Sequence, residues 1–230
     1  SGLLLWMSHP AWPSMIWQLY TYDFETTGAY FGARKACSPL HVQMNAHDRK
    51  VVALNVTRTP LPEAEVRLAF YDRAGRPVGE EKRFRTALPA NAKVACFDAV
   101  CPAAPGPVLA RLSLLDPSGR VLDLNDYWLP GPDQFRALAG GGAPPPSLSA
   151  SLSPQGEGRA TVLVSNRGAG VAGGVRLQLV DAATGRRVLP AYFSDGWFSL
   201  LPGESRTVRL DGWREGIALD ACRVVVAGEW

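Results

Sequence analysis

Three residues near the start of the chain, Trp6, His9 and Trp12, are of types that could bind a sugar. Tryptophan faces stack on the apolar C–H faces of pyranose rings, with dispersion and desolvation as the gain. An imidazole can hydrogen-bond a hydroxyl or exchange a proton. The alternative is that at least two of the three tryptophans at positions 6, 12 and 17 fill a core, and that a lone histidine beside Pro10 is structural or solvated.

Two acids that follow, Asp23 and Glu25, could suggest a catalytic carboxylate pair. A retaining glycosidase holds its two carboxyls about 5 Å apart across the substrate. Two acids beside the first turn of a helix are more simply explained as favourable charges at the positive end of the helix dipole. We therefore predict that Asp23 and Glu25 are not a catalytic pair.

Other chemistry-bearing motifs are missing from the sequence. There is no phosphate-binding glycine loop, no nucleophile elbow and no histidine pair at metal spacing, so we expect no cofactor and no metal. The net charge is +3 and the basic residues are scattered singly, which predicts no nucleic-acid partner. The apolar run at residues 3–7 is too short for a membrane span.

Two further features leave alternatives open. Cys96 and Cys101 could form a local disulfide across a turn or remain free thiols, whereas Cys37 and Cys222 are expected to be small core residues. Asn55 opens an Asn-Val-Thr glycosylation sequon, but it lies inside a predicted strand, and such short matches are common by chance.

The elements that would position Trp6, His9 and Trp12 resemble one unit of an α/β barrel. Residues 3–7 predict a buried strand and residues 8–14 a loop, and from Asp23 the pattern predicts a helix that Pro39 ends. Thr26 or Thr27 could cap this helix. Its apolar positions at helical spacing are Ala29, Tyr30, Ala33, Ala36 and Cys37.

After residue 40 the sequence predicts short strands with partial period-2 alternation, separated by turns such as Arg-Ala-Gly-Arg and Pro-Ser-Gly. About seven strands precede the Gly- and Pro-rich linker at residues 137–147, and about seven follow it, which is the count of an immunoglobulin-like sandwich. We therefore predict a mainly β fold. Its expected parts are a barrel tail at 1–38, a sandwich at 39–136, the linker, and a second sandwich at 148–230.

Residues 2–44 resemble the end of the catalytic barrel in glycoside hydrolase family 2, in the clade of exo-β-D-glucosaminidases and β-mannosidases. The motifs that carry this resemblance are Trp6-Met7, Ala11-Trp12-Pro13, Trp17-Gln18-Leu19, the Gly28–Ala36 stretch and Pro39–Gln43. The stretch from Phe193 to Val208 is also similar to the last sandwich of that clade.

The resemblance implies a multidomain retaining β-glycosidase acting on terminal glucosaminide or mannoside residues, with this chain as its C-terminal portion. Both catalytic glutamates would lie on earlier barrel strands, so the chain alone would be inactive. Trp6 matches a tryptophan at the floor of the sugar site, and His9 stands where relatives often have asparagine. A glycan substrate suggests periplasmic or secreted localisation.

The expected partners are a carbohydrate substrate, the remainder of the barrel, and a second copy bound through the apolar start of the chain. The rival hypothesis is a non-catalytic carbohydrate-binding or adhesion module built of immunoglobulin-like domains. Such a module should present a solvent-facing aromatic row, for example Trp197, Phe198 and Trp213, whereas bracing domains should bury these side chains.

Overall fold

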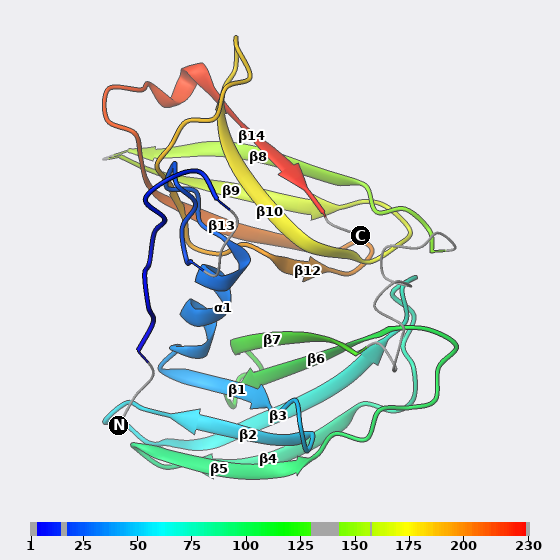
Figure 1. The fold of residues 1–230 in the computed structure, drawn as a ribbon. Helices are drawn as coiled ribbons and strands as arrows, with labels where there is room; N and C mark the ends of the chain where they lie inside the picture. Colours follow the sequence, from blue (N-terminus) through cyan, green and yellow to red (C-terminus); the bar gives the residue numbers. More distant parts are fainter. Residues whose placement is uncertain (1–3, 15–17, 130–142, 157, 229–230) are drawn as a thin grey trace. The chain divides into compact units, whose positions relative to one another are not determined.

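The computed structural model describes residues 4–14, 18–129, 143–156 and 158–228. The chain divides into two compact units, one of residues 34–143 and one that combines residues 1–33 with residues 144–230. Most of the predicted linker, residues 137–142, lies outside the described residues. Figure 1 shows that nearly all regular structure is β-strand, as the sequence predicts.

The described part of the unit of residues 34–143 contains seven antiparallel strands. They are β1 (Leu40–Met44), β2 (Lys50–Asn55), β3 (Leu61–Tyr71), β4 (Lys82–Leu88), β5 (Ala92–Asp98), β6 (Val108–Leu115) and β7 (Val121–Leu129). One sheet has the order β1-β2-β5 and the other the order β4-β3-β6-β7. The seven strands predicted for this region are therefore confirmed.

Period-2 alternation builds the core of this unit. In β3, Ala64, Val66, Leu68 and Phe70 are buried while the residues between them are only partly covered. Strand β6 lies between β3 and β7 in its sheet, and it is buried almost throughout. Its side chains are therefore covered on both faces of the sheet.

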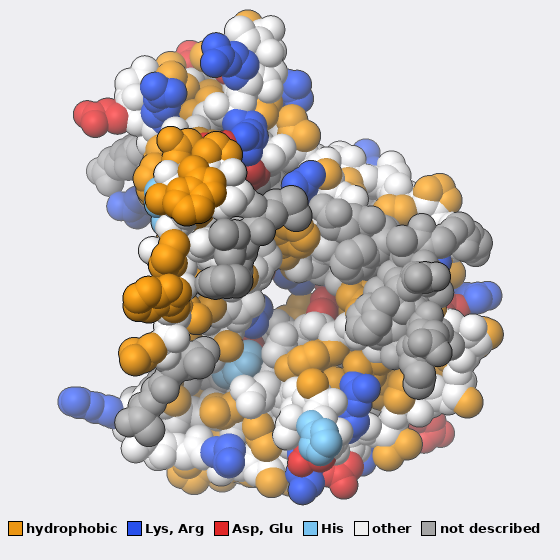
Figure 2. All heavy atoms as spheres, viewed as in Figure 1, with side chains coloured by type: hydrophobic (Ala, Val, Ile, Leu, Met, Phe, Trp, Pro, Cys, Tyr) orange, Lys and Arg blue, Asp and Glu red, His pale blue; other side chains and the backbone are white. Residues whose placement is uncertain are grey.

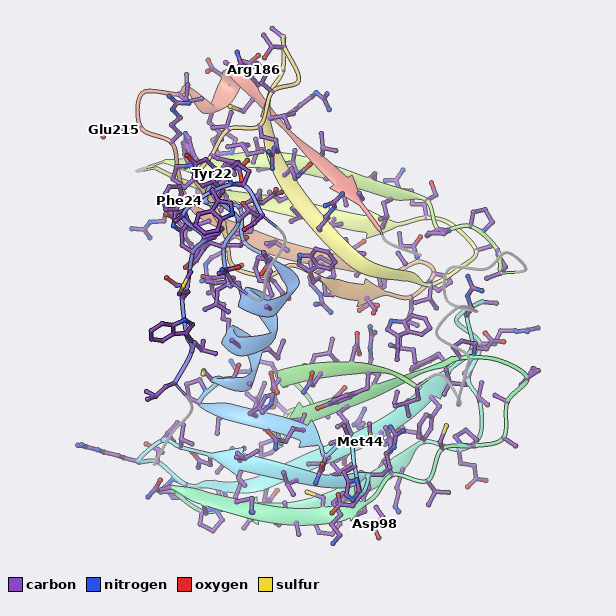
Figure 3. All side chains as sticks on the ribbon, in the orientation of Figure 1. Tyr22, Phe24, Met44, Asp98, Arg186 and Glu215 are labelled. Atoms are coloured by element: carbon purple, nitrogen blue, oxygen red, sulfur yellow. The ribbon has the colours of Figure 1, made fainter. Side chains whose placement is uncertain are left out.

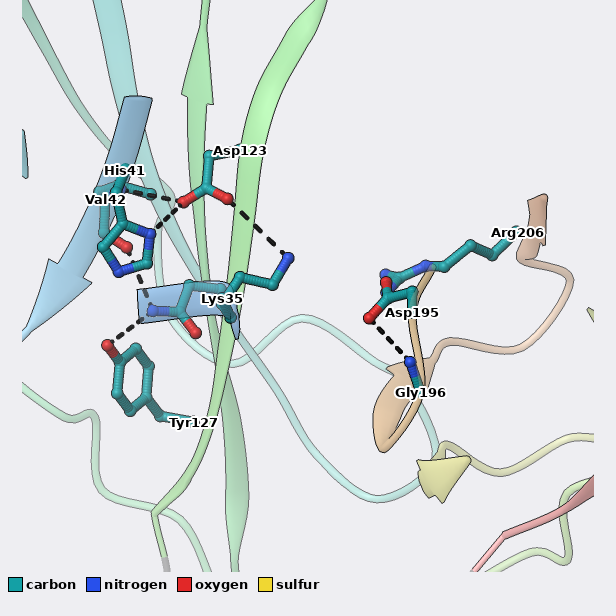
Figure 4. Close-up of polar contacts among 9 residues, drawn as sticks. Lys35, His41, Val42, Asp123, Tyr127, Asp195, Gly196 and Arg206 are labelled. Atoms are coloured by element: carbon teal, nitrogen blue, oxygen red, sulfur yellow. Dashed lines mark hydrogen bonds and ion pairs between the residues drawn. The ribbon is translucent and has the colours of Figure 1, made fainter. Parts of the chain in front are cut away.

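Among the described strands, β1 pairs only with β2, which leaves backbone N–H groups on its other edge without a strand partner. Side chains of β7 accept hydrogen bonds from these N–H groups (Figure 4). The Asp123 carboxylate accepts hydrogen bonds from the Val42 amide at 3.0 Å and pairs with His41 Nδ1 at 2.7 Å. The Tyr127 hydroxyl accepts the Met44 amide at 3.0 Å. Because buried backbone N–H groups are costly when unpaired, the bonds to Val42 and Met44 stabilise β1, while the buried His41 imidazole pairs with Asp123.

Two hairpins of this unit use the same five-residue turn, Asp-x-x-Gly-Arg. In Asp72–Arg76 and in Asp116–Arg120, the aspartate accepts the backbone N–H groups two and four residues later and pairs with the closing arginine. The glycines, Gly75 and Gly119, have φ of 73° and 84°, which side chains rarely adopt. The turn stretches identified in the sequence are thus confirmed.

The Asp116 turn gives a pH-dependent prediction. Its hydrogen bond from Ser118, followed by those from Arg120, lowers the pKa of Asp116 to about 2. A depressed carboxyl pKa means that the turn's contribution to folding is complete above the unfolded value, about 4, and is lost as the pH falls through about 2. We expect the Asp116 carboxyl carbon to titrate in NMR with a midpoint near 2, and Ser118→Ala to raise that midpoint. A midpoint of 3.8 or above would contradict this interpretation.

The unit that includes residues 144–230 also contains seven strands. They are β8 (Leu148–Gly156), β9 (Arg159–Asn166), β10 (Ala172–Asp181), β11 (Ala191–Phe193), β12 (Phe198–Leu200), β13 (Ser205–Trp213) and β14 (Cys222–Ala227). They form sheets of order β11-β13-β9-β8 and β12-β10-β14, with a short 3₁₀ turn, η1 (Leu219–Ala221), before β14. The count again confirms the prediction.

An asparagine closes the second strand of each sandwich in the same way. The Asn55 side-chain amide donates to the carbonyls of Thr59 and Leu88 and accepts the Thr57 N–H. Asn166 donates to the carbonyls of Gly170 and Leu200 and accepts the Gly168 N–H. Both side chains are fully buried. The amide of Asn55 is therefore unavailable for glycosylation, although it matches the sequon.

All four cysteines are free thiols in the structure. Burial raises the pKa of Cys96, Cys101 and Cys222, which favours the unreactive thiol form. Cys222 packs against the core of the second sandwich. Cys37 is exposed, so the expectation that it is a core residue is wrong. It lies just after the helix, beyond the turns that contact the core.

Candidate substrate-facing segment

Residues 4–27, here called the N-terminal segment, carry the candidate sugar-binding side chains. The strand predicted over residues 3–7 is not formed: Leu4, Leu5, Trp6 and Met7 are exposed and irregular, and residues 1–3 lie outside the described part. A barrel strand is held by hydrogen bonds to strands on both sides. None of the described strands pairs with this stretch, so its apolar sequence alone does not make it a strand.

A tight loop closed by the Tyr20–Thr26 bridge forms the second half of the segment. The Tyr20 amide donates to the Ser8 carbonyl at 3.0 Å, which ties the first half to this loop. Within it, the Thr21 amide donates to the Glu25 carbonyl at 2.9 Å. Burial, followed by the neighbouring phenols of Tyr30 and Tyr192, raises the pKa of Tyr20, so this hydroxyl stays neutral near pH 7.

His9 lies against two aromatic rings of that loop. Its ring stacks on Phe24 with centroids 4.4 Å apart, and Tyr22 lies parallel at 6.3 Å. Its Nε2 contacts the Tyr22 carbonyl at 3.0 Å. Tyr22 and Phe24, labelled in Figure 3, are about half exposed. The imidazole is thus held on one side by aromatic contacts.

Trp6 and Trp12 are exposed by 78% and 64%. Neither side chain packs in a core of the described residues, and Trp17 lies outside them. The interpretation that at least two of the three tryptophans fill the barrel core stays a prediction. Figure 2 shows hydrophobic side chains gathered along the face where Figure 1 places the N-terminal segment. Its exposed apolar residues are Leu4, Leu5, Trp6, Met7, Trp12, Tyr22 and Phe24.

Two bulky residues of this segment have an unusual backbone conformation. Met7 and Phe24 have φ of 60° and 66°, in the left-handed region that bulky residues rarely occupy. Each such conformation costs about 1–3 kcal/mol and persists only where its surroundings enforce it.

Asp23 and Glu25 form an ion-pair bridge to the second sandwich. Arg187, in the loop between β10 and β11, places Nη2 2.5 Å from Asp23 Oδ2 and Nη1 2.5 Å from Glu25 Oε2. Gln178 of β10 donates to Glu25 Oε1 at 2.5 Å. The helix begins only at Gly28 and has no acid in its first turn, so the helix-dipole explanation of these two acids is wrong. They serve as partners of one arginine.

The predicted helix is confirmed as α1 (Gly28–Ala36), with the Thr27 hydroxyl 3.4 Å from the Tyr30 amide at its start. Its buried residue is Phe31, which packs in the core of the second sandwich, whereas Ala29 and Ala36 are exposed. A Cβ at Gly196 would lie 2.7 Å from the Phe31 ring, so only glycine allows this approach.

The possible aromatic row of the second sandwich is mostly packed, although Trp197 is 37% exposed. Phe198 is buried, and the Arg206 guanidinium covers its ring at 4.4 Å. Trp213 packs against the core and donates Nε1–H to the Ile217 carbonyl at 2.8 Å. The Trp197 ring lies against Gly28 of α1. Asp195, which accepts the Gly196 N–H and pairs with Arg206, fixes the turn that presents Trp197 (Figure 4).

Two cavities bear on the choice of site. One of about 100 Å³ lies where the N-terminal segment meets the second sandwich, lined by residues that include Thr21, Asp195 and Trp197. A larger one of about 610 Å³, in the unit of residues 34–143, contains Glu65 with Arg67 and Arg85. Those arginines lower the pKa of Glu65, as expected of a satisfied surface ion-pair network.

No described helix has the length and hydropathy of a membrane span.

Sequence reasoning missed Tyr22, Phe24, Gly196 and Arg187. The aromatic spacing in Tyr20-Thr-Tyr22-Asp-Phe24 was a signal that could have drawn attention to the first two. Gly196 lies in an Asp-Gly-Trp turn, and this sequence is a weaker signal. Arg187 has no local signal, because its partners lie more than 160 residues away in the sequence.

The described residues thus form two antiparallel β-sandwiches and an aromatic segment that contacts the second one. Residues 130–229 match the family described as the exo-β-D-glucosaminidase Ig-fold domain. An exo-β-D-glucosaminidase of Streptomyces avermitilis is 31% identical over 99% of this chain. The crystal structure of the Amycolatopsis orientalis exo-chitosanase CsxA superposes over 97% of the chain with a TM-score of 0.79 and 25% identity.

A β-D-mannosidase from Dictyoglomus thermophilum shares the fold, with a TM-score of 0.70 over 97% of the chain and 25% of its own length, at 16% identity. The chain spans 28% of the Streptomyces enzyme and 29% of the CsxA chain. It is therefore identified as a relative of the exo-β-D-glucosaminidases of glycoside hydrolase family 2, corresponding to their C-terminal portion. The resemblance seen in the sequence is confirmed.

Proposed function

We propose that this chain is the C-terminal portion of a retaining β-glycosidase that removes terminal glucosaminide residues from glycans. The relatives with the most extensive similarity are named exo-β-D-glucosaminidases, which favours glucosaminide over mannoside. The two catalytic glutamates lie elsewhere in the polypeptide, and the sandwiches brace the catalytic barrel. Because the substrate is a glycan polymer, we place the enzyme in the periplasm or outside the cell.

Within this portion, Trp6, His9 and Trp12 shape the substrate site. The observation that carries this proposal is the exposure of Trp6 and Trp12 on a segment whose other side is fixed to the second sandwich. Exposed tryptophan faces suit a pyranose ring, and the oriented His9 suits one of its hydroxyls. The remainder of the barrel covers the apolar residues that the sugar does not contact.

The rival function, a carbohydrate-binding module, receives less support. It requires an exposed aromatic row on the second sandwich, and Phe198 and Trp213 are both packed into that sandwich. The bracing role, in contrast, explains why Trp197 contacts the helix at Gly28.

A panel of aryl β-glycosides, offered to this chain and to the longer polypeptide, tests the proposal. We expect the longer polypeptide to hydrolyse the β-D-glucosaminide in preference to the mannoside, galactoside and glucuronide. We expect the chain alone to hydrolyse none, because it lacks the carboxylate pair. Turnover by the chain alone would overturn the placement of the catalytic groups. Absence of turnover by both, together with direct glycan binding by residues 145–230, would favour the binding module.

The same chain without the barrel exposes the apolar residues of the N-terminal segment. We therefore propose that it self-associates through them, and sedimentation with Trp6→Ser and Trp12→Ser measures this. A chain that stays monomeric at high concentration would contradict this part of the proposal.

A further inference from the structure

The ion-pair bridge between the second sandwich and the N-terminal segment has a consequence for substrate binding. Arg187 contacts Asp23 and Glu25, which flank Phe24 in the sequence. Phe24 in turn carries the stacked ring of His9. A continuous path of contacts therefore runs from the loop between β10 and β11 to the imidazole.

We infer that Arg187 is a positioning residue of the substrate site, which acts through Asp23, Glu25 and Phe24 to set the orientation of His9. This inference rests on the proposed function of the N-terminal segment. It makes the second sandwich, beyond its bracing role, a determinant of substrate affinity.

The geometry of the guanidinium suits this role. Its planar fork offers two N–H groups in fixed directions, and here each one contacts a different carboxylate at 2.5 Å. The two carboxylates are thereby held a set distance apart, with the Phe24 backbone between them. Phe24 has φ of 66°, a conformation that needs support from its neighbours.

Two further contacts keep the bridge in place. Gln178, on the regular strand β10, donates to Glu25, and the Thr21 hydroxyl donates to Asp23 at 2.5 Å. The side chains of Arg187 and Asp23 are 43% and 40% exposed. Ion pairs with that exposure add little to folding stability, so the effect of the bridge is expected in the orientation of the segment.

Arg186 provides a matched control. It is the neighbouring residue in the same loop, it is exposed, and its side chain forms no ion pair within the described part of the chain (Figure 3). Arg187→Gln and Arg186→Gln remove the same charge from the same loop. A difference between the two variants therefore reports the bridge rather than the net charge.

Hydrogen exchange on this chain measures the bridge itself. We expect the amides of residues 18–27 to exchange at least about tenfold faster in Arg187→Gln than in Arg186→Gln, because local opening becomes easier. We expect the core strands β9 and β13 to be unchanged in both variants. Equal exchange of residues 18–27 in the two variants would overturn the inference.

Kinetics of the full-length enzyme on p-nitrophenyl β-D-glucosaminide measure the consequence. We expect Arg187→Gln to raise KM about fivefold while kcat changes less than about twofold, because His9 contributes to binding and not to bond cleavage. Arg187→Lys keeps the charge but not the planar fork, so its KM should lie between those of the wild type and Arg187→Gln. An unchanged KM, or a fall in kcat alone, would overturn the positioning role.

Failure of the two proposals can be told apart. If the wild-type enzyme hydrolyses no aryl β-glycoside, the proposed function fails, and the substrate role of Arg187 fails with it. If the wild-type enzyme is active but the Arg187 variants show the same KM and the same hydrogen exchange as Arg186→Gln, the glycosidase proposal stands. In that case only the positioning inference is overturned.

Discussion

Replacing Asn166 by alanine is expected to lower the free energy of unfolding of the second sandwich by about 3 kcal/mol. Asn166 is fully buried, and its amide donates to the carbonyls of Gly170 and Leu200. Its oxygen accepts the N–H groups of Ser147 and Gly168. Alanine replaces none of these bonds, and water cannot reach the groups left behind.

The twin substitution in the other unit, Asn55→Ala, should have a similar effect on the first sandwich, since Asn55 is as buried and bonds in the same pattern. Chemical denaturation followed by NMR of each unit measures the two effects separately, because a chain with two units need not unfold in one transition. Asn45→Ala, at an exposed asparagine that accepts one amide, is the control and should cost less than about 1 kcal/mol. If Asn166→Ala lowers the free energy of unfolding by no more than Asn45→Ala does, the prediction is wrong.

Replacing Phe31 by alanine is expected to cost about 3–5 kcal/mol in the second sandwich. The ring is 8% exposed and belongs to the core of that sandwich, where it contacts Gly196. The substitution leaves a cavity that the rigid β-sandwich fills only in part. The helix α1 has nine residues, which is too few for stability in isolation. We therefore also expect the helix to fray once its anchor is removed.

Thermal unfolding and the hydrogen exchange of residues 28–36 measure this second prediction. Phe24→Ala is a suitable control, because Phe24 lies in the same part of the chain but is 49% exposed. It should leave the stability within about 1 kcal/mol of the wild type. Equal effects of the two phenylalanine substitutions would show that Phe31 does not anchor the helix.

Local features of the sequence were sufficient to predict the strands, the helix and the tight turns. The alternation of Val66, Leu68 and Phe70 defines an inward face without reference to any other part of the chain. The Asp-x-x-Gly-Arg turn is likewise complete within five residues. The dense motifs of residues 2–44 were enough to suggest the glycosidase family, and the Trp-rich start was enough to suggest where a sugar would bind.

Contacts between distant residues were decided only by the tertiary structure. The sequence offers no sign that Arg187 meets Asp23 and Glu25, because ion pairing across such a separation depends on the packing of a whole sandwich. The apolar run through Leu4 and Met7 has the composition of a buried strand but lies exposed. Strand formation needs hydrogen-bonding neighbours, and a sequence pattern can state only that a segment would accept them.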